Sequence, residues 1–361
     1  MTFSGEERIY IWLDSFPLEE QEKQKLLKAA ESPKKLLSDL AKLFPSVIKS
    51  GKESVYNTMA DSLKDGGAYF RSVLEALEQN GVTPIPYPSK LYPEPLKELS
   101  TPPLVLYAKG DVSLLQTELF AIVGSRITPQ TAMRTGKTIS KDLSERFTLL
   151  TGTADGGDTA AIEGGLSGSG KIVCFAAGGL NALPKNNAPL LDKVLRQGLI
   201  LTACPPNTPV RSFSFERRNE LLATLCKGAL VLSAGEKSGA LITAKYVQKA
   251  SKPLFALPYP PESPAGAGCN GLIKQGARLT ERANDIFSFF GIKETLTEKK
   301  TLSLTEDENT VITALNQEHE ISLSLLAAQT KIPAYKLAGI VTALEVKGLI
   351  VKTGGNKIAL I

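Results

Sequence analysis

Residues 124–126, which follow the apolar stretch LFAIV, combine groups suited to binding a phosphate. Gly124 lets the backbone approach a ligand closely, and the N–H groups that follow it can form an anion nest. Ser125 contributes a hydroxyl group. Arg126 contributes a permanent positive charge and a bidentate fork that matches phosphate oxygens. The chemistry predicted for this loop is anion binding.

Four further loops after apolar stretches carry similar residues: GTADGG (152–157), GGLNALPKNN (178–187), CPPNTP leading to FERRN (204–219), and KSGA (237–240). The last precedes a predicted helix, whose N-terminus favours anions. These loops contain no nucleophile–base pair, acid–base pair or metal-ligand set. They therefore favour binding of a phosphate backbone over catalysis. Phe215 could either stack on a base or belong to the core.

The rare residues exclude several other classes of site. The chain has a single histidine, His319, so no multi-histidine metal site is available, and its neighbouring glutamates predict a solvated surface position. The four cysteines show no CxxC spacing, which leaves a zinc or redox motif without support. Neither GxGxxG nor GxxxxGK[ST] occurs, so the usual NAD and P-loop fingerprints are missing. We expect no cofactor and no enzymatic activity.

Composition indicates a soluble globular protein. Of the 361 residues, 42% are hydrophobic and 22% are charged, and the net charge is +5. This mildly basic balance permits an anionic partner without requiring one. Neither a run of about 18 apolar residues nor a secretory leader is present, so we expect a cytoplasmic protein with no membrane partner. At about 100–200 residues per domain, the length predicts two or three domains.

The elements that must position the loops follow from hydrophobic periodicity. Helices are predicted over 18–30, 32–44 and 68–81, which gives a helical domain at 1–81. Residues 82–111 hold seven prolines and predict an ordered, extended connector. From 119 to 290, apolar strands alternate with helices, and their continuous apolar runs are typical of parallel strands covered on both faces. The predicted fold class is α/β, with a doubly wound, mostly parallel, Rossmann-like sheet.

The last part of the chain predicts a separate small domain. Residues 291–304 are polar and read as a linker, and 305–361 form the domain itself. Helices are predicted near 306–317, 322–329 and 333–346, followed by two short strands around Gly354-Gly355, the winged-helix pattern. The third helix carries Lys336 and Lys347 but no arginine. A recognition helix with so little charge favours a protein-contact or structural role for the domain, and reading of duplex DNA is the alternative.

Several motifs in order resemble the DprA/Smf family of DNA-processing proteins. VGSR follows the first strand, GTADGGDTAAIEGGL resembles the family's SGxARGID segment, and PPNTP resembles PPGTP. FERRNELLATL resembles FPxRNRxIAGL, and KSGALITAKYVQKASKPLFALP and GCNGLIKQGARL resemble the two segments that follow. The resemblance covers residues 84–287 and makes 82–290 an extended Rossmann-like DNA-binding domain. It also implies that the N-terminal helical domain is SAM-like or helix-hairpin-helix-like.

The resemblance implies a function in natural transformation or recombination. The family protects incoming single-stranded DNA and loads the RecA recombinase onto it, acts as a homodimer and needs no cofactor. Motif by motif, seven residues are expected to contact phosphates: Gly124, Ser125, Arg126, Gly152, Gly156, Ser238 and Gly239. Six more are expected to line the path of the strand: Lys185, Asn187, Phe215, Arg217, Arg218 and Asn219.

This sequence departs from the family pattern at four positions. Asp155 and Glu220 stand where the family has arginines, Ile162 replaces a histidine, and Ser233 replaces a glutamate. The first two changes weaken attraction to phosphate if the side chains face the strand. The alternatives are that these positions face inward, or that basic residues elsewhere compensate.

A second hypothesis is a Rossmann-like hydrolase of nucleotides or sugar phosphates. Phosphoribohydrolases of similar fold carry a GGxGTxxE motif. The nearest string here, GGLNALPK, lacks both the threonine and the glutamate.

Overall fold

The computed structural model describes residues 2–48, 51–292, 304–316, 320–353 and 357–360. The chain divides into two compact units, Met1–Ile292 and Lys293–Ile361. Among the described residues, no helix is both long enough and apolar enough to cross a membrane. His319, the turn at Gly354-Gly355 and most of the predicted linker lie outside the described residues.

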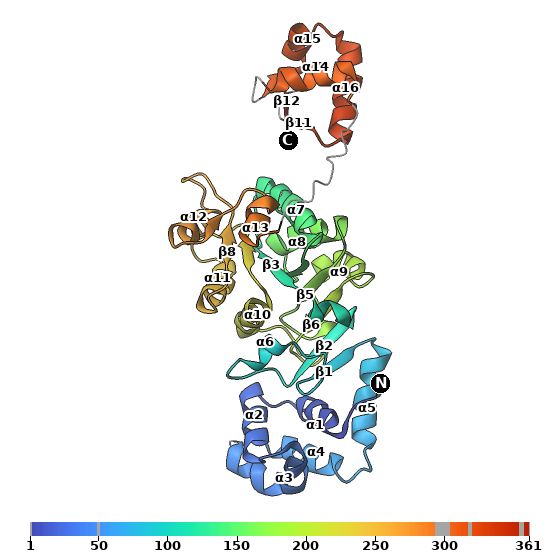
Figure 1. Ribbon diagram of the computed structural model, residues 1–361. Coiled ribbons are helices and arrows are strands. Elements are labelled where there is room, and N and C mark those ends of the chain that lie inside the picture. Colours follow the sequence, from blue (N-terminus) through green and yellow to red (C-terminus); the bar gives the residue numbers. More distant parts are fainter. Residues whose placement is uncertain (1, 49–50, 293–303, 317–319, 354–356, 361) are drawn as a thin grey trace. The chain divides into compact units, whose positions relative to one another are not determined.

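The described residues ahead of position 80 form helices, drawn in blue in Figure 1. Helices α2, α3 and α5 were predicted, whereas α1 and α4 were not. Helix α1 begins with a capping box between Ser4 and Glu7, which is a local signal for the start of a helix. Helix α4 buries only one apolar side chain, Met59, which explains its weak periodicity. The helices are α1 (Gly5–Asp14), α2 (Glu20–Ala29), α3 (Pro33–Val47), α4 (Glu53–Ser62) and α5 (Ala68–Gln79).

A sheet of nine strands, in the order β1-β2-β6-β5-β4-β3-β7-β8-β9, dominates the first unit. Every pairing from β6 to β9 is parallel, which confirms the predicted fold class. The strands are β1 (Thr83–Pro86), β2 (Val105–Gly110), β3 (Leu119–Val123), β4 (Thr148–Thr151), β5 (Ile172–Phe175), β6 (Leu199–Thr202), β7 (Ala229–Val231), β8 (Leu254–Ala256) and β9 (Arg278–Leu279).

The prediction of a connector at 82–111 was wrong in one respect, because this segment belongs to the sheet. Strands β1 and β2 pair antiparallel with each other, and β2 pairs antiparallel with β6. Strand β1 contains Pro84 and Pro86, which an edge strand tolerates because it needs hydrogen bonds on one side only. A short helix, α6 (Glu94–Lys97), lies between β1 and β2.

The N-terminal helices pack against this edge of the sheet through a buried polar contact. Lys23 of α2 donates a hydrogen bond of 2.8 Å to Asp14 of α1, and the Tyr107 hydroxyl of β2 donates one of 2.7 Å to the same carboxylate. Helices and sheet therefore belong to one compact unit. The domain boundary at residues 81–82 stays a prediction.

Helices cover both faces of the sheet (Figure 1). Phe120 and Ile122 of β3 belong to the core on the side of α7 and α8, and Ala121 and Val123 belong to the core on the side of α10 and α11. Helices α12 and α13 were not predicted. The helices are α7 (Gln130–Ser144), α8 (Gly157–Ser167), α9 (Ala188–Val194), α10 (Ser212–Leu225), α11 (Ala240–Lys249), α12 (Ala267–Lys274) and α13 (Ala283–Phe289).

The second unit has the predicted winged-helix-like arrangement and its own core, which includes Val311, Leu337 and Val341. Strand β12 lies between β10 and β11 in an antiparallel sheet. The two-residue strand β10 was not predicted. The elements are α14 (Glu306–Leu315), β10 (Ile321–Ser322), α15 (Leu323–Thr330), α16 (Ala334–Val346), β11 (Ile350–Thr353) and β12 (Lys357–Leu360).

Candidate nucleic-acid interface

The first two loops, which follow β3 and β4, touch backbone to backbone at the carboxyl edge of the sheet. The Gly157 N–H donates a 3.0 Å hydrogen bond to the Ser125 carbonyl. A Cβ on Gly157 would lie 2.4 Å from the Gly124 Cα, and a Cβ on Gly156, whose φ is +76°, would lie 2.2 Å from the Ser125 oxygen. Glycine is therefore required where these loops cross.

The first loop is also tied to the end of β7. The Ser125 N–H donates to both the backbone oxygen of Ser233, at 2.9 Å, and its hydroxyl, at 3.1 Å. The Thr128 and Ser233 hydroxyls lie 2.7 Å apart. Ser233 is completely buried, so this departure from the family pattern faces inward and holds the first loop in place.

A buried ion pair connects the second loop to α10. The Arg218 Nη1 atom lies 3.7 Å from the Asp158 carboxylate, which also accepts a hydrogen bond from the Ala154 N–H at 3.1 Å. Burial raises the pKa of Asp158 and lowers that of Arg218. Both side chains are about nine-tenths buried or more. Arg218 is therefore an internal residue, and its ion pair with Asp158 stabilises the second loop.

Arg126 of the first loop contacts Phe215 in the first turn of α10. Arg126 is exposed, and its guanidinium carbon lies 4.8 Å from the centre of the half-buried Phe215 ring. A cation over an aromatic face is held by the ring quadrupole and keeps its charge. The arrangement positions a cation at the loop edge and covers one face of the aromatic ring.

Both predicted asparagines are internal. The Asn187 side chain donates to the Thr153 carbonyl at 3.1 Å, and Asn219 donates to the Gly239 carbonyl at 3.4 Å. Both residues are buried and join neighbouring loops. Lys185, in contrast, is exposed and places a second cation at this edge.

The remaining predicted residues differ in how open their surroundings are. Gly152 is buried, because Arg218 and Asp158 fill the space that a side chain would need. Ser238 is half-buried, and its hydroxyl accepts from the Ala240 N–H at 3.3 Å. Gly239, at the start of α11, has open space where a Cβ would project.

Of the two acidic departures, only Asp155 points into solvent. Asp155 is exposed in the second loop, whereas Glu220 is half-buried and pairs with Arg217 at 2.6 Å. Arg217 itself also pairs with Glu20. The structure therefore separates three arginines by environment: Arg126 is exposed, Arg218 is buried, and Arg217 is held by two carboxylates.

A profile of the family described as DNA recombination-mediator protein A matches residues 83–291, more than half of the chain. The chain belongs to this family. It is 33% identical over 218 residues to the DNA processing protein DprA of Bacillus subtilis, covering 60% of this chain and 73% of the relative. It is 33% identical over 213 residues to the protein Smf of Escherichia coli, covering 58% and 57% respectively.

Two solved structures of DNA processing protein A are similar to this one. That from Streptococcus pneumoniae matches with a TM-score of 0.66 and 26% identity, over 80% of this chain and 98% of that chain. That from Helicobacter pylori matches with a TM-score of 0.53 and 27% identity, over 58% and 95% respectively. The latter structure concerns the single-stranded DNA binding mode of the Helicobacter protein.

Sequence reasoning missed two exposed residues of this DprA/Smf family member at the start of α10. Arg211 is exposed, and the Phe213 side chain is 66% exposed. The preceding loop is well held, because the Gly179 N–H donates to the Thr208 carbonyl and the Asn181 N–H to the Pro206 carbonyl, both at 2.9 Å. Sequence offered a basic and an aromatic residue here, but no signal that both face solvent.

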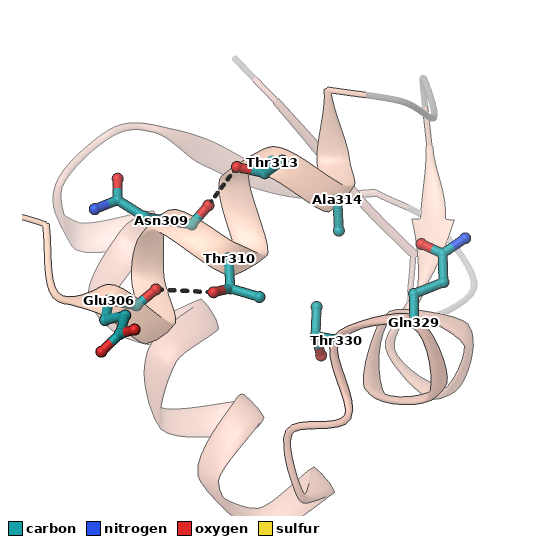
Figure 2. Close-up of a pocket in the computed structure, with 7 residues that line it drawn as sticks. All are labelled: Glu306, Asn309, Thr310, Thr313, Ala314, Gln329 and Thr330. Atoms are coloured by element: carbon teal, nitrogen blue, oxygen red, sulfur yellow. Dashed lines mark hydrogen bonds between the residues drawn. The ribbon is translucent and has the colours of Figure 1, made fainter.

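A depression of about 600 Å³ in the second unit has different chemistry (Figure 2). Its three threonine hydroxyls donate within the helices that carry them, Thr310 to the Glu306 carbonyl and Thr313 to the Asn309 carbonyl in α14, and Thr330 to the Leu326 carbonyl in α15. None of the predicted site residues lines it. The predicted interface therefore stays at the loop edge of the first unit, where its candidate residues lie. Its lining residues are Glu306, Asn309, Thr310, Thr313, Ala314, Gln329 and Thr330.

The third helix of the second unit, α16, presents little unbalanced positive charge. Lys336 pairs with Asp307 at 2.6 Å, and Lys347 pairs with Glu308 at 2.7 Å. A helix that reads duplex DNA needs cations directed at phosphates and base edges. This pairing favours the protein-contact interpretation of the second unit, which stays a prediction.

Proposed function

We propose that this chain binds single-stranded DNA along the loops at the carboxyl edge of its sheet. The observation that carries the proposal is the exposed Arg126 guanidinium, held over the Phe215 ring where the first and second loops cross. An accessible cation beside an aromatic residue and backbone N–H groups suits a phosphate backbone with unstacked bases. The Helicobacter relative, whose structure concerns single-stranded DNA binding, supports the same assignment.

Within this proposal the predicted residues have two kinds of role. Arg126, Lys185 and the additional Arg211 supply charge to phosphates, and Phe215 and Phe213 supply aromatic surface to bases. Gly124, Ser125, Gly156, Ser238 and Gly239 supply backbone or hydroxyl groups. The buried Gly152, Asn187, Arg218 and Asn219 position the loops without reaching the strand.

Membership of a recombination-mediator family extends the proposal beyond binding. We propose that the bound strand is protected and passed to the RecA recombinase during transformation or recombination. A homodimer would place two such edges on one strand. In this scheme the chain acts in the cytoplasm as a binding protein and catalyses no reaction.

The test is fluorescence polarisation of a labelled oligo-dT strand over a salt series, with a duplex competitor. Arg126→Ala should weaken binding about tenfold and reduce the salt slope by about 0.7, the value for one phosphate contact on a single strand. Arg196→Ala is the matched control, because Arg196 is exposed just ahead of β6, at the opposite edge of the sheet. Binding that is absent or insensitive to salt would contradict the proposal. Release of base from nucleoside monophosphates would then test the hydrolase alternative.

A further inference from the structure

Arg217 is surrounded by acceptors that belong to other parts of the first unit. Its Nε and Nη2 atoms donate to the two carboxylate oxygens of Glu20, at 3.2 and 3.0 Å, which is a bidentate pair. Its Nη1 atom donates to Glu220 at 2.6 Å, and Nη2 also donates to the Thr101 carbonyl. One guanidinium thus joins α2, α10 and the segment between α6 and β2.

The charge of this cluster is wrong for a phosphate contact. Arg217 brings one positive charge, and Glu20 and Glu220 bring two negative charges within hydrogen-bond distance. A strand passing here would meet a net negative group, and most guanidinium donors are already used. Arg217 is therefore unsuited to the role that sequence motifs predicted for it, a contact along the strand.

The segment between α6 and β2, which Arg217 contacts at Thr101, accepts further hydrogen bonds at its next two residues. Gln24, one turn after Glu20 in α2, donates to the Pro102 carbonyl, and the buried Tyr92 hydroxyl donates to the Pro103 carbonyl at 2.7 Å. Three successive carbonyls thus accept hydrogen bonds from α10, from α2 and from Tyr92, which lies two residues ahead of α6. These contacts fix the distance between α2 and α10.

Because residues of α10 also contact the loops at the sheet edge, the position of α10 affects the position of those loops. The residues after Arg217 are Arg218, which pairs with Asp158 of the second loop, and Asn219, which donates to the Gly239 carbonyl of the fifth loop. The ring of Phe215, two residues before Arg217, contacts the Arg126 guanidinium. A shift of α10 would therefore displace all three contacts together.

We propose that Arg217 is a positioning residue that locks α10 to the N-terminal helices, so that α2 controls single-stranded DNA affinity without touching the strand. This inference rests on the proposed function. It assigns the Glu20–Arg217–Glu220 cluster a positioning role and makes the N-terminal helices a support of the DNA site. The separate contact among Lys23, Asp14 and Tyr107 keeps these helices attached when the cluster is broken.

Glu20→Gln in the full chain distinguishes a lock from a phosphate contact that Glu20 blocks, because the two roles predict opposite changes in oligo-dT affinity. A lock predicts oligo-dT binding about threefold to tenfold weaker with an unchanged salt slope. A phosphate contact released from its carboxylate predicts tighter binding and a steeper slope. Glu22→Gln is the matched control, because Glu22 lies in the same helix but pairs with Lys52 at 2.5 Å.

Arg217→Lys provides a second variant that keeps the charge and loses the bidentate fork. The lock predicts that this variant resembles Glu20→Gln, whereas a phosphate contact through charge predicts nearly normal binding. Hydrogen exchange of the α10 amides in the DNA-free protein gives a readout that does not depend on DNA binding. Exchange should accelerate in both variants and stay unchanged in Glu22→Gln.

Unchanged exchange in α10 in both variants would overturn the lock, whatever the binding result. Tighter binding by Glu20→Gln would also overturn it. If wild-type protein fails to bind oligo-dT, the proposed function fails, and the exchange experiment still decides whether Arg217 constrains α10.

Discussion

At the scale of single residues, the partners of each charged group decide what that group can do. Arg217 and Arg218 are neighbours in α10, yet one meets Glu20 and Glu220 and the other meets Asp158. Arg126 meets only the face of an aromatic ring among the described residues and stays accessible. A phosphate can therefore bind Arg126 at a lower desolvation cost than it could bind Arg217 or Arg218.

Gly152→Ala should disrupt the interface from beneath. A Cβ at this position would lie 1.7 Å from the Arg218 Nη1 atom and 2.2 Å from the Asp158 carboxylate. Separation of this buried pair should cost about 3 kcal/mol of unfolding free energy and should weaken oligo-dT binding. Urea unfolding followed by the fluorescence of Trp12, the single tryptophan, measures the stability.

Gly239→Ala is the matched control, because a Cβ there meets no described atom within 4 Å. It should leave the unfolding midpoint within experimental error of wild type. Equal stability of the Gly152→Ala variant and wild type would show that the Arg218–Asp158 pair does not need the space beside Gly152.

Asp155→Asn should strengthen binding. The carboxylate is exposed in the second loop, and a like charge near the strand repels its phosphates. The expected gain is about threefold at low salt, decreasing as salt screens the repulsion. Asp192→Asn, an exposed substitution in α9, controls for the change in net charge. Identical affinities for Asp155→Asn and wild type in low salt would place the path of the strand away from this side chain.

At the scale of elements, one side chain can both cap a helix and join it to a second helix. Glu308 lies in the first turn of α14, where its carboxylate accepts from the Thr305 N–H at 2.8 Å and from Lys347, at the end of α16, at 2.7 and 2.8 Å. Hydrogen bonds from Lys347, with the capping contact, lower the pKa of Glu308. The carboxylate therefore stabilises the folded second unit in its ionised form.

Glu308→Gln should destabilise the second unit at neutral pH. Because the folded-state pKa is below the unfolded value, the contribution of Glu308 is present above about pH 4 and is lost as pH falls through the folded pKa. The difference between wild type and variant should therefore shrink in acid. Methyl NMR of Val341 during urea unfolding reports this unit. Glu306→Gln, an exposed change in the same turn, is the control. An equal loss for both variants, or a difference independent of pH, would contradict the assignment.

At the scale of the whole molecule, the two compact units have separate cores. All of the predicted site residues belong to the first unit, and the α16 lysines of the second are paired with acids. The two units should therefore unfold separately, and the first should suffice for binding single strands.

Removal of residues 293–361 should leave oligo-dT affinity within about twofold of the full chain, because no predicted contact is lost. The unfolding midpoint seen by the buried Trp12 should also stay unchanged. A large loss of single-strand affinity would show that the second unit contributes to the strand's path. Selective loss of duplex binding would support the duplex-reading alternative for α16.

The sequence by itself determined the α/β class and the position of the loops. Continuous apolar runs predicted β3 to β8, because strands buried on both faces need apolar residues at every position. Glycines after β3, β4, β5 and β7 predicted loops suited to phosphate, whereas the crossing of the first two loops became visible only in the structure. Strands β1 and β2 were not predicted, because a segment rich in prolines and tyrosines resembles an extended connector.

Only the tertiary structure decided which of the predicted site residues are accessible. Glu20 lies 197 residues from Arg217 in the chain, and Asp158 is likewise remote from Arg218. No local pattern reveals such partners, because the fold alone brings them within a few ångströms. The accessibility of Arg126, the burial of Arg218 and the pairing of Arg217 therefore follow from long-range contacts that the sequence encodes only through the complete fold.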